Sequence, residues 1–420
     1  MPTVSSENHL TAGGPRVHLT PAQSRLVLCL LGALCVITPL SIDLYLPAFL
    51  EMGREFHTDS ATISLSVSTY FLGLAIGQVF YGPILDRFGR KLPLCIGLGA
   101  FILTSIACAF ATNVPALLVL RFCQGFGGCA ASVGCVTMVR DFFPARESAR
   151  VFSLLFLFVG VSPLLAPSLG GLLLYFISWK AIFLVLAGIA LAIVILVSTF
   201  LPEGHPADPS ISLRPGPVLA EFLIILRHPQ FLTYTLAGTF SFAGLFAFVA
   251  GSPVVFMEGY HLSPQAYSGV FALLTASFIG SSQVNILLLK RFTSETIFAR
   301  AIAVQAATAL LFILGACFHW YNFAATLAFF FVILGCAGLT NPNGCSLALM
   351  PFHKNTGSAA ALMGFLQLTI GALISTGVSW ATKSSLPVIA ILAASSTIGV
   401  VLLFFGEQWI NRAGSSSARD

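Results

Sequence analysis

Twelve long apolar segments, separated by short polar ones, constrain this sequence more than any other feature. Each segment is at least as long as the roughly 20 residues that an α-helix needs to cross the hydrocarbon core of a bilayer. The segments are continuously apolar, whereas the strands of a membrane barrel alternate between apolar and polar residues. We therefore predict transmembrane helices near residues 26–48, 62–84, 93–112, 115–139, 151–176, 181–201, 230–257, 265–289, 298–317, 323–349, 357–381 and 387–406.

Composition supports this all-α polytopic prediction. Hydrophobic residues make up 57% of the chain and charged residues only 8%, against about 25% charged residues in an average soluble domain. A water-soluble protein of this size could not cover its surface with so few charges, so the partner of that surface is a lipid bilayer. The net charge of +5 comes from short basic clusters between apolar segments, so we predict no nucleic-acid partner.

The longest polar stretch between segments, 202–229, divides the chain into two sets of six helices. We predict a tail at 1–25, a six-helix bundle at 26–201, a linker at 202–229, a second six-helix bundle at 230–406 and a tail at 407–420. The dipeptide Ser148-Ala149 recurs as Ser358-Ala359 at the matching place in the second half, which agrees with duplication but can also arise by chance.

Lysine and arginine predict the orientation of the helices. Sixteen of the 20 fall in the segments on the same side as both termini. Because cytoplasmic loops carry an excess of these residues, we expect both termini and the linker to be cytoplasmic.

Two charges stand inside apolar segments, Asp43 in the first and Arg121 in the fourth. A charged residue at membrane depth costs about 2.5–3.5 kcal/mol on insertion scales, so it usually has a function, a partner or contact with water. Both lie at a similar predicted depth and could pair or share a water-filled cavity. Alternatively, Asp43 is an interfacial acid at a frayed helix end, and Arg121 is a structural hydrogen-bonding centre.

Asp43 has the properties of a proton carrier. Burial disfavours the charged form of a carboxyl group, and a nearby guanidinium favours it. A conformational change that altered either effect would load a proton on one face of the membrane and release it on the other. We therefore predict proton coupling through Asp43 and Arg121, with no cofactor beyond the proton gradient.

Three further patterns fall at helix ends and interfaces. The turn between the second and third segments combines glycines, which permit a tight turn and a close helix approach, with an acid and basic residues: Gly82, Asp86, Arg87, Gly89, Arg90 and Lys91. Arg121 and Gln124 are three residues apart and share a helix face, while Gly125 and Gly128 allow close helix packing. Pro167, Gly170 and Gly171 predict a kink followed by a close contact in the fifth helix.

Polar and aromatic residues inside the segments are candidates for substrate binding, although interhelical hydrogen bonds or packing against lipid would also explain them. They are Tyr45, Tyr70, Gln124, Tyr234, Phe242, Phe246, Asn341, Asn343 and Gln367. The ten cysteines and eight histidines show no metal-ligand spacing. We therefore expect no metal site and no enzyme.

Several of these motifs resemble a known family. The segment Gly82 to Lys91, the segment Leu117 to Gly127, and Ala166 to Gly171 are similar to signatures of the major facilitator superfamily. Its bicyclomycin-resistance (Bcr/CflA) drug:proton antiporters are resembled by four stretches: Pro39 to Ala48, Arg140 to Pro144, Trp179 to Phe183, and Pro342-Asn343 through Gly357-Ser358-Ala359. Ala166 departs from the usual Gly of the antiporter motif.

The resemblance implies two six-helix bundles with a site between them at mid-membrane. It also implies that the motif from Gly82 to Lys91 is the gating motif, with Gly82, Asp86 and Arg90 in the inner gate. It further implies a monomeric, proton-coupled multidrug exporter of small apolar or aromatic compounds of the bicyclomycin, sulfonamide or chloramphenicol type, in a bacterial inner membrane. The alternative is an exporter or symporter of a small metabolite on the same fold.

Overall fold

Twelve helices of this protein are long and apolar enough to cross a membrane. The computed structural model describes residues 20–143, 145–204, 207–209, 215–318, 322–352, 356–380 and 385–417. Within these residues, each predicted segment coincides with one such helix, so the prediction of an all-α protein with twelve spans is confirmed.

The first six spans use eight helical elements, because the first span is interrupted. They are α1 (Pro21–Asp43), the 3₁₀ turn η1 (Leu46–Ala48), α2 (Phe49–Glu55), α3 (Ser60–Phe88), α4 (Lys91–Ala109), α5 (Val114–Phe142), α6 (Ala145–Phe176) and α7 (Trp179–Phe200).

The remaining elements comprise one helix before the seventh span and six further spans. They are α8 (Pro215–Leu226), α9 (Pro229–Ser252) with the π-helical turn η2 (Pro253–Gly259), α10 (Pro264–Leu288), α11 (Ser294–Cys317), α12 (Phe323–Leu349), α13 (Thr356–Trp380) and α14 (Ser385–Ser417). Helix α8 lies within the predicted linker.

The first span is longer than predicted and has a break in its middle. We expected it to end near residue 48, but helical structure resumes after η1 and continues to Glu55. Pro47 has no N–H with which to bond the carbonyl of Asp43, so the α-helical hydrogen-bond ladder stops there. Asp43 therefore lies at a joint inside the span and not at a frayed end.

Side-chain caps mark where several helices begin. Asp59, Asn113, Ser263, Thr293 and Asn322 each accept a hydrogen bond from the main-chain N–H three residues later. These bonds satisfy N–H groups that have no partner within the helix. The short polar segments thus define the helix starts as well as the turns.

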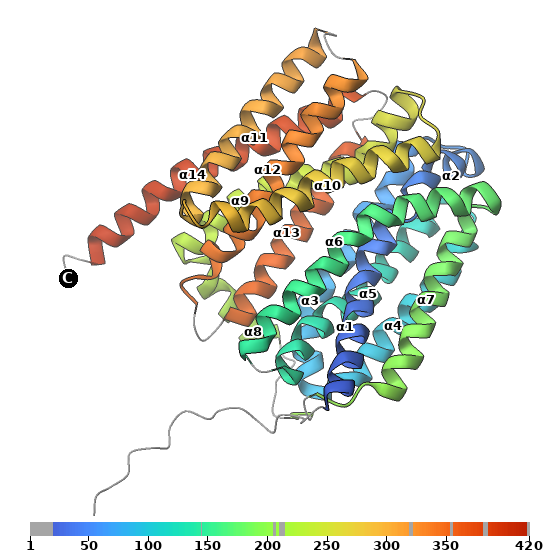
Figure 1. The fold of residues 1–420 in the computed structure, drawn as a ribbon, viewed down its shortest axis with the longest axis horizontal. Coiled ribbons are helices and arrows are strands. Elements are labelled where there is room, and N and C mark those ends of the chain that lie inside the picture. The colour runs from blue at the N-terminus through green and yellow to red at the C-terminus, as the bar shows by residue number, and fades with distance from the viewer. Residues whose placement is uncertain are drawn as a thin grey trace, which may run out of the picture.

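On the face formed by α6 and α10, the two bundles meet at one end of the molecule and separate toward the other. We call these the α2 end and the linker end, after α2 and α8. Figure 1 shows α6 and α10 side by side near α2 and splayed apart further away. One core of buried residues runs through both bundles, whereas a second core lies within the C-terminal half and holds the buried residues Ile225, Phe231, Phe298 and Leu347.

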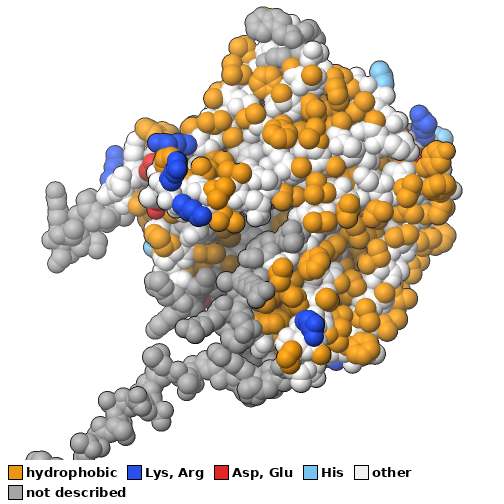
Figure 2. All heavy atoms as spheres, in the orientation of Figure 1, with side chains coloured by type: hydrophobic (Ala, Val, Ile, Leu, Met, Phe, Trp, Pro, Cys, Tyr) orange, Lys and Arg blue, Asp and Glu red, His pale blue; other side chains and the backbone are white. Residues whose placement is uncertain are grey.

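The outer surface is apolar, as the composition predicts. Figure 2 shows apolar side chains over most of the visible face, with lysine and arginine toward its margins. Large side chains such as Leu103, Ile195 and Phe405 are more than half exposed in the absence of lipid. Exposure on this scale is expected of a surface that faces hydrocarbon chains.

Glycines let α3 and α5 pack with their backbones in contact. A Cβ atom at Gly73 would fall on the main chain of Phe122, and one at Gly125 would fall on the main chain of Tyr70. This confirms the prediction that glycines in the fourth span permit a close helix approach, a common device where lipid supplies no hydrophobic drive for helix association.

We expect Gly73→Ala to destabilise the N-terminal bundle by about 1–3 kcal/mol, the usual cost of overpacking a close contact. The measurement is the apparent melting temperature of the purified protein in detergent. Gly99→Ala is the matched control, since Gly99 lies in α4 with no atom within 4 Å of an added Cβ. It should leave the melting temperature unchanged or raise it, because alanine favours a helix over glycine by about 1 kcal/mol. Equal effects of the two substitutions would contradict this account of the α3–α5 contact.

Candidate functional site

Arg121 lies at the centre of the N-terminal bundle with its guanidinium fully buried. Its Nη1 donates a 2.5 Å hydrogen bond to Oε1 of Gln124, and its Nη2 donates one of 3.1 Å to the carbonyl oxygen of Ser41. Gln124 in turn donates to the hydroxyl of Ser105 at 2.7 Å. The predicted Arg121–Gln124 pair therefore forms, and it links α1, α4 and α5.

Two tyrosine rings enclose the same guanidinium. The Arg121 Cζ atom is 4.4 Å from the ring centroid of Tyr45 and 4.3 Å from that of Tyr70, with Phe183 at 5.8 Å. A cation is attracted to the face of an aromatic ring, most strongly where water is excluded. Tyr45 and Tyr70 are themselves fully buried, so in this conformation they hold Arg121 and do not line an open cavity.

The charge of Arg121 is incompletely satisfied. Its Nε is buried without a hydrogen-bond partner, as are the nearby hydroxyls of Thr38 and Tyr70. Within the described residues, no carboxylate lies within ion-pair distance of the guanidinium. Buried arginines are usually paired, so this cluster is electrostatically unusual.

Asp43 is the second buried charge and lies where α1 ends. Its side chain is 4% exposed, and in the described part of the chain its carboxyl group has no hydrogen bond or ion pair. The adjacent η1 packs against α10 of the other bundle. Asp43 is thus a buried acid beside the contact between the bundles, and it is not the interfacial acid that the sequence left open.

The structure does not join Asp43 to Arg121 as an ion pair. The two residues are connected through the main chain instead, since Arg121 bonds the carbonyl of Ser41, two residues before Asp43. Their similar depth allowed either direct pairing or a shared water-filled cavity. Direct pairing is absent from this conformation.

Four of the other candidate substrate residues lie in the C-terminal bundle and form two contacting pairs. Phe242 packs edge-on against Phe246, with ring centroids 5.3 Å apart. Gln367 donates a 3.3 Å hydrogen bond to Oδ1 of Asn341. Phe242, Asn341 and Gln367 are half-buried. The Phe246 ring also meets Phe71 of the N-terminal bundle at 4.7 Å.

Two further candidates are parts of the packed core. Tyr234 packs edge-on against Phe298 in the C-terminal core. Asn343 is buried and donates a 2.7 Å hydrogen bond to Oδ1 of Asn285. The sequence allowed either substrate binding or internal packing for Tyr234 and Asn343. In this conformation both residues are part of the packed interior.

The motif in α6 connects the two bundles at the α2 end. The carbonyl of Pro167 accepts a 2.7 Å hydrogen bond from Ser268 on α10. A Cβ atom at Gly170 would fall on the carbonyl oxygen of Leu44, and one at Gly171 would lie 3.2 Å from the Ser268 hydroxyl. The predicted close contact of Gly170 and Gly171 therefore forms, and it lies directly beside Asp43.

A second contact between the bundles lies on the opposite pair of helices. The hydroxyls of Ser64 on α3 and Ser379 on α13 are hydrogen-bonded at 2.5 Å. Further from the α2 end, the side chain of Gln78 lies against Gly364. The Ser64–Ser379 bond and the Ser268–Pro167 bond both involve neutral groups only.

The linker end carries an ionic network around Arg90. The Arg90 guanidinium is paired with Asp86 and, at 2.8 Å, with Asp141. Burial lowers the pKa of this guanidinium, but the hydrogen bonds with Asp141 and Asp86 outweigh burial, so the pKa lies above its ordinary value. Arg90 thereby ties the end of α3 to the end of α5.

Glu203 completes this network from the end of the sixth span. Its Oε1 accepts hydrogen bonds from the main-chain N–H groups of Arg90 and, at 3.2 Å, of Lys91. These N–H groups begin α4, where a carboxylate is favoured by the helix dipole. Lys91 also donates a 3.0 Å bond to the carbonyl of Ser198 on α7. Asp141 and Glu203 were not among the predicted gating residues.

The remaining residues of the gating motif differ in role. Gly89 has a φ of 83°, a left-handed conformation that favours glycine and forms the turn. Gly82 has no atom within 4 Å of an added Cβ, so the expected close approach at Gly82 is absent here. The Arg87 guanidinium lies 5.8 Å from the ring centroid of Phe88.

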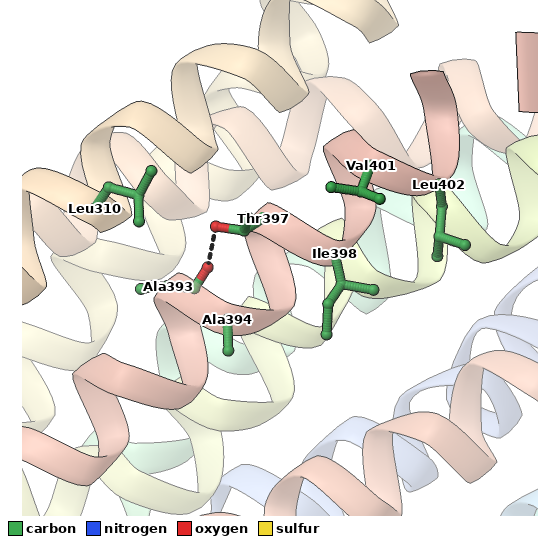
Figure 3. Close-up of a pocket in the computed structure, with 7 residues that line it drawn as sticks. All are labelled: Leu310, Ala393, Ala394, Thr397, Ile398, Val401 and Leu402. Atoms are coloured by element: carbon green, nitrogen blue, oxygen red, sulfur yellow. Dashed lines mark hydrogen bonds between the residues drawn. The ribbon is translucent and has the colours of Figure 1, made fainter. Parts of the chain in front are cut away.

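An apolar hollow of about 400 Å³ lies elsewhere, on the face of α14 toward α11 (Figure 3). The one polar side chain of its lining is Thr397, whose hydroxyl donates to the carbonyl of Ala393 at 2.7 Å. The hollow is lined by Leu310, Ala393, Ala394, Thr397, Ile398, Val401 and Leu402. It includes none of the predicted site residues and is suited to contact with lipid.

Comparisons with known proteins agree with the geometry. The family described as Major Facilitator Superfamily matches residues 30–378. The chain is 33% identical to the "Uncharacterized MFS-type transporter YdgK" of Bacillus subtilis, over 93% of this chain and 97% of that protein. It is 30% identical to the "Bicyclomycin resistance protein homolog" of Haemophilus influenzae, over 89% and 94% of the two chains. It is also 28% identical to the "Multidrug resistance protein MdtL" of Shigella flexneri, over 91% and 95%.

We expect Asp141→Asn to destabilise the protein by about 3 kcal/mol, because it removes a charge from a mostly buried pair and leaves Arg90 undercompensated. Thermal unfolding in detergent measures the effect. Lys180→Gln is the control, because the Lys180–Glu55 pair has both side chains more than 40% exposed and should contribute less than about 1 kcal/mol. A loss no larger in Asp141→Asn than in Lys180→Gln would show that the network does not support the linker end.

Proposed function

The chain belongs to the Major Facilitator Superfamily, and within it we propose that this transporter is a proton-coupled exporter of small apolar or aromatic compounds. It is a multi-pass membrane transporter and not an enzyme. Relatives at about 30% identity are named for resistance to bicyclomycin and to multiple drugs, which supports drug-like cargo. We further propose that it acts as a monomer in a bacterial inner membrane, with its linker end and both termini in the cytoplasm.

The observation that carries the proposal is the buried carboxyl group of Asp43 beside the contact between the bundles. Without a counter-ion, a carboxyl group in such a place is favoured in its neutral, protonated form. Gly170 packs on the carbonyl of Leu44, the residue after Asp43. Separation of the bundles at the α2 end would therefore change the surroundings of Asp43 at once.

This location suggests how a proton is exchanged for cargo. When the α2 end opens, water reaches Asp43 from outside and can supply a proton. When that end closes, Asp43 is buried again and keeps the proton until cargo or water arrives from the linker end. A transporter that releases the proton only toward the cytoplasm uses the proton gradient to drive export.

Arg121 is suited to couple this step to the rest of the bundle. Its hydrogen bond to the Ser41 carbonyl connects the guanidinium to the same joint that carries Asp43. Movement of that joint would bring the carboxyl group nearer to the guanidinium or farther from it, and so favour or disfavour the ionised form.

The cargo surface that we propose combines aromatic and amide groups. Phe71 and Phe246 meet between the bundles, and Phe242 lies between Phe246 and Phe278. Aromatic side chains offer large apolar contact areas with favourable edge-on and offset geometries. This composition supports apolar or aromatic cargo.

One observation favours a second candidate, the export or symport of a small metabolite. Asn341 and Gln367 are half-buried and bonded to each other, so a polar compound could replace that bond with its own. A cargo recognised mainly through Asn341 and Gln367 would be more polar than the drug-like compounds that we propose.

We expect Asp43→Asn to abolish drug-induced proton movement in everted vesicles and to remove the tolerance that the wild type confers on a pump-deficient host. Asparagine keeps the shape of the side chain but cannot carry a proton. Glu295→Gln, an exposed acid in the first turn of α11, should leave both measurements unchanged.

Full proton-coupled transport by Asp43→Asn would exclude Asp43 as the carrier. Absence of drug tolerance and proton movement in the wild type itself, across a panel of aromatic compounds, would exclude drug:proton antiport.

We expect Phe246→Ala to raise the KM for aromatic cargo about tenfold, which corresponds to a loss of about 1.4 kcal/mol of binding free energy. Phe405→Ala is the control, because Phe405 is 63% exposed on α14 and faces lipid. Radiolabelled or fluorescent cargo in vesicles measures the effect. An equal effect of both substitutions, or none of Phe246→Ala, would exclude Phe246 from the cargo surface.

A further inference from the structure

A small cavity lies between the two bundles at the α2 end. Its volume is about 250 Å³. Pockets for drug-sized ligands measure about 300–1,000 Å³, and one water molecule takes up about 30 Å³ in the liquid. The cavity therefore suits a polar group smaller than a drug. Its lining includes Pro47, Glu51, Arg54, Leu174 and Tyr175 from the N-terminal bundle and Gln265 from the C-terminal bundle.

This cavity lies at the depth of the lipid headgroups. Its residues come from the end of the first span, the end of α6 and the first turn of α10, and the ends of spans lie in the interfacial layer of a bilayer. Tyr175 and its neighbours Phe176 and Ile177 are all more than two-thirds exposed. A tyrosine at this depth places its ring among acyl chains and its hydroxyl in water. The rim of the cavity therefore faces lipid.

Two opposite charges line the cavity from one face of α2. Glu51 and Arg54 are three residues apart and so are neighbours on the helix surface. Oε1 of Glu51 accepts a 3.3 Å hydrogen bond from the main-chain N–H of Trp179, and within the described residues its Oε2 has no hydrogen bond. Arg54 is exposed and forms no ion pair in the described part of the chain. The nearby Glu55 is paired with Lys180 at 2.7 Å.

We propose that this cavity binds the headgroup of phosphatidylethanolamine. Arg54 binds the phosphate, Glu51 accepts hydrogen bonds from the ammonium group, and the acyl chains lie along Leu174 and Tyr175. A primary ammonium group donates three hydrogen bonds, whereas the quaternary ammonium of phosphatidylcholine donates none. Phosphatidylglycerol has no cation for Glu51. The assignment of this lipid to the outer leaflet rests on the proposed orientation of the transporter, but the binding itself does not.

The bound headgroup holds the bundles together at the α2 end. Glu51 and Arg54 belong to the N-terminal bundle, whereas Gln265 belongs to the C-terminal bundle, and its amide can donate to the same phosphate. The site is complete only while the bundles meet. A ligand that binds one conformation better shifts the equilibrium toward it, so this lipid favours the closed α2 end.

The first test measures lipid binding to the purified full-length protein in detergent. Phosphatidylethanolamine in mixed micelles should raise the apparent melting temperature more than phosphatidylcholine or phosphatidylglycerol, because a ligand of the folded state stabilises it. Glu51→Gln and Arg54→Gln should each weaken binding about tenfold, since each removes a charge-assisted hydrogen bond. Arg300→Gln replaces an exposed arginine of α11 outside the cavity and should bind like the wild type. Equal binding of the three lipids, or unchanged binding in both cavity variants, would overturn the proposal.

Free phosphoethanolamine distinguishes a lipid from a soluble ligand. It carries the same two charges but no acyl chains, so it should leave the melting temperature unchanged at concentrations where the lipid acts. Binding as tight as that of the lipid would show that the occupant is a soluble zwitterion, and would overturn the assignment to a lipid.

The second test measures whether the lipid keeps the α2 end closed. Ser268 is 2% exposed at the contact between α10 and α6, so a cysteine there reacts with a maleimide only when the bundles separate. Phosphatidylethanolamine should slow the labelling of Ser268→Cys, with the wild type as the background for the native thiols. An unchanged rate would overturn the closing role of the lipid. Neither test involves transport or protons, so the outcome is separate from that of the proposed function.

Discussion

Arg121 brings a permanent charge into the middle of an apolar bundle, and five helices are arranged around it. A guanidinium cannot lose its proton in a protein, so the surrounding groups must compensate the charge. The carbonyl of Ser41 comes from α1, the ring of Tyr70 from α3, the amide of Gln124 from α5 and the ring of Phe183 from α7. The Ser105 hydroxyl of α4 accepts a hydrogen bond from the same amide. The relative positions of these helices follow from satisfying one cation.

In the C-terminal bundle, a hydrogen-bond network without any charged group links the helices. Ser241 on α9 bonds Gln305 on α11 at 2.5 Å and Thr340 on α12 at 2.6 Å, and Gln305 returns a bond to the Ser241 carbonyl at 2.9 Å. This network also links three helices through an amide, but every group in it is neutral. Under the proposed proton coupling through Asp43, a change in proton binding would therefore act on the N-terminal bundle and reach the C-terminal bundle through the contacts between them.

The sequence predicted those features that depend on residues close together in the chain. Apolar length defines the spans, and the three-residue spacing of Arg121 and Gln124 places them on one face. The sequence did not predict contacts in which the two residues come from distant segments of the chain. Glu203 reaches the start of α4 from more than 100 residues away, and no local pattern reports such a contact. The distance between Asp43 and Arg121 likewise depends on how α1 crosses α5, whereas similar depth along two helices says nothing about that crossing.

The two ends of the molecule are held by different kinds of interaction, and this difference determines which bonds must break when either end opens. The ionic network of Arg90 lies within the N-terminal bundle, so the linker end can stand open without breaking an ion pair. At the α2 end the bundles are joined by the neutral pairs Ser64–Ser379 and Ser268–Pro167, each worth about 1 kcal/mol net. A conformational equilibrium shifts tenfold for every 1.4 kcal/mol of differential free energy. Burying an unpaired carboxylate costs more than that. Under the proposed function, protonation of Asp43, which lies near the Ser268–Pro167 contact, would therefore be sufficient to favour a closed α2 end.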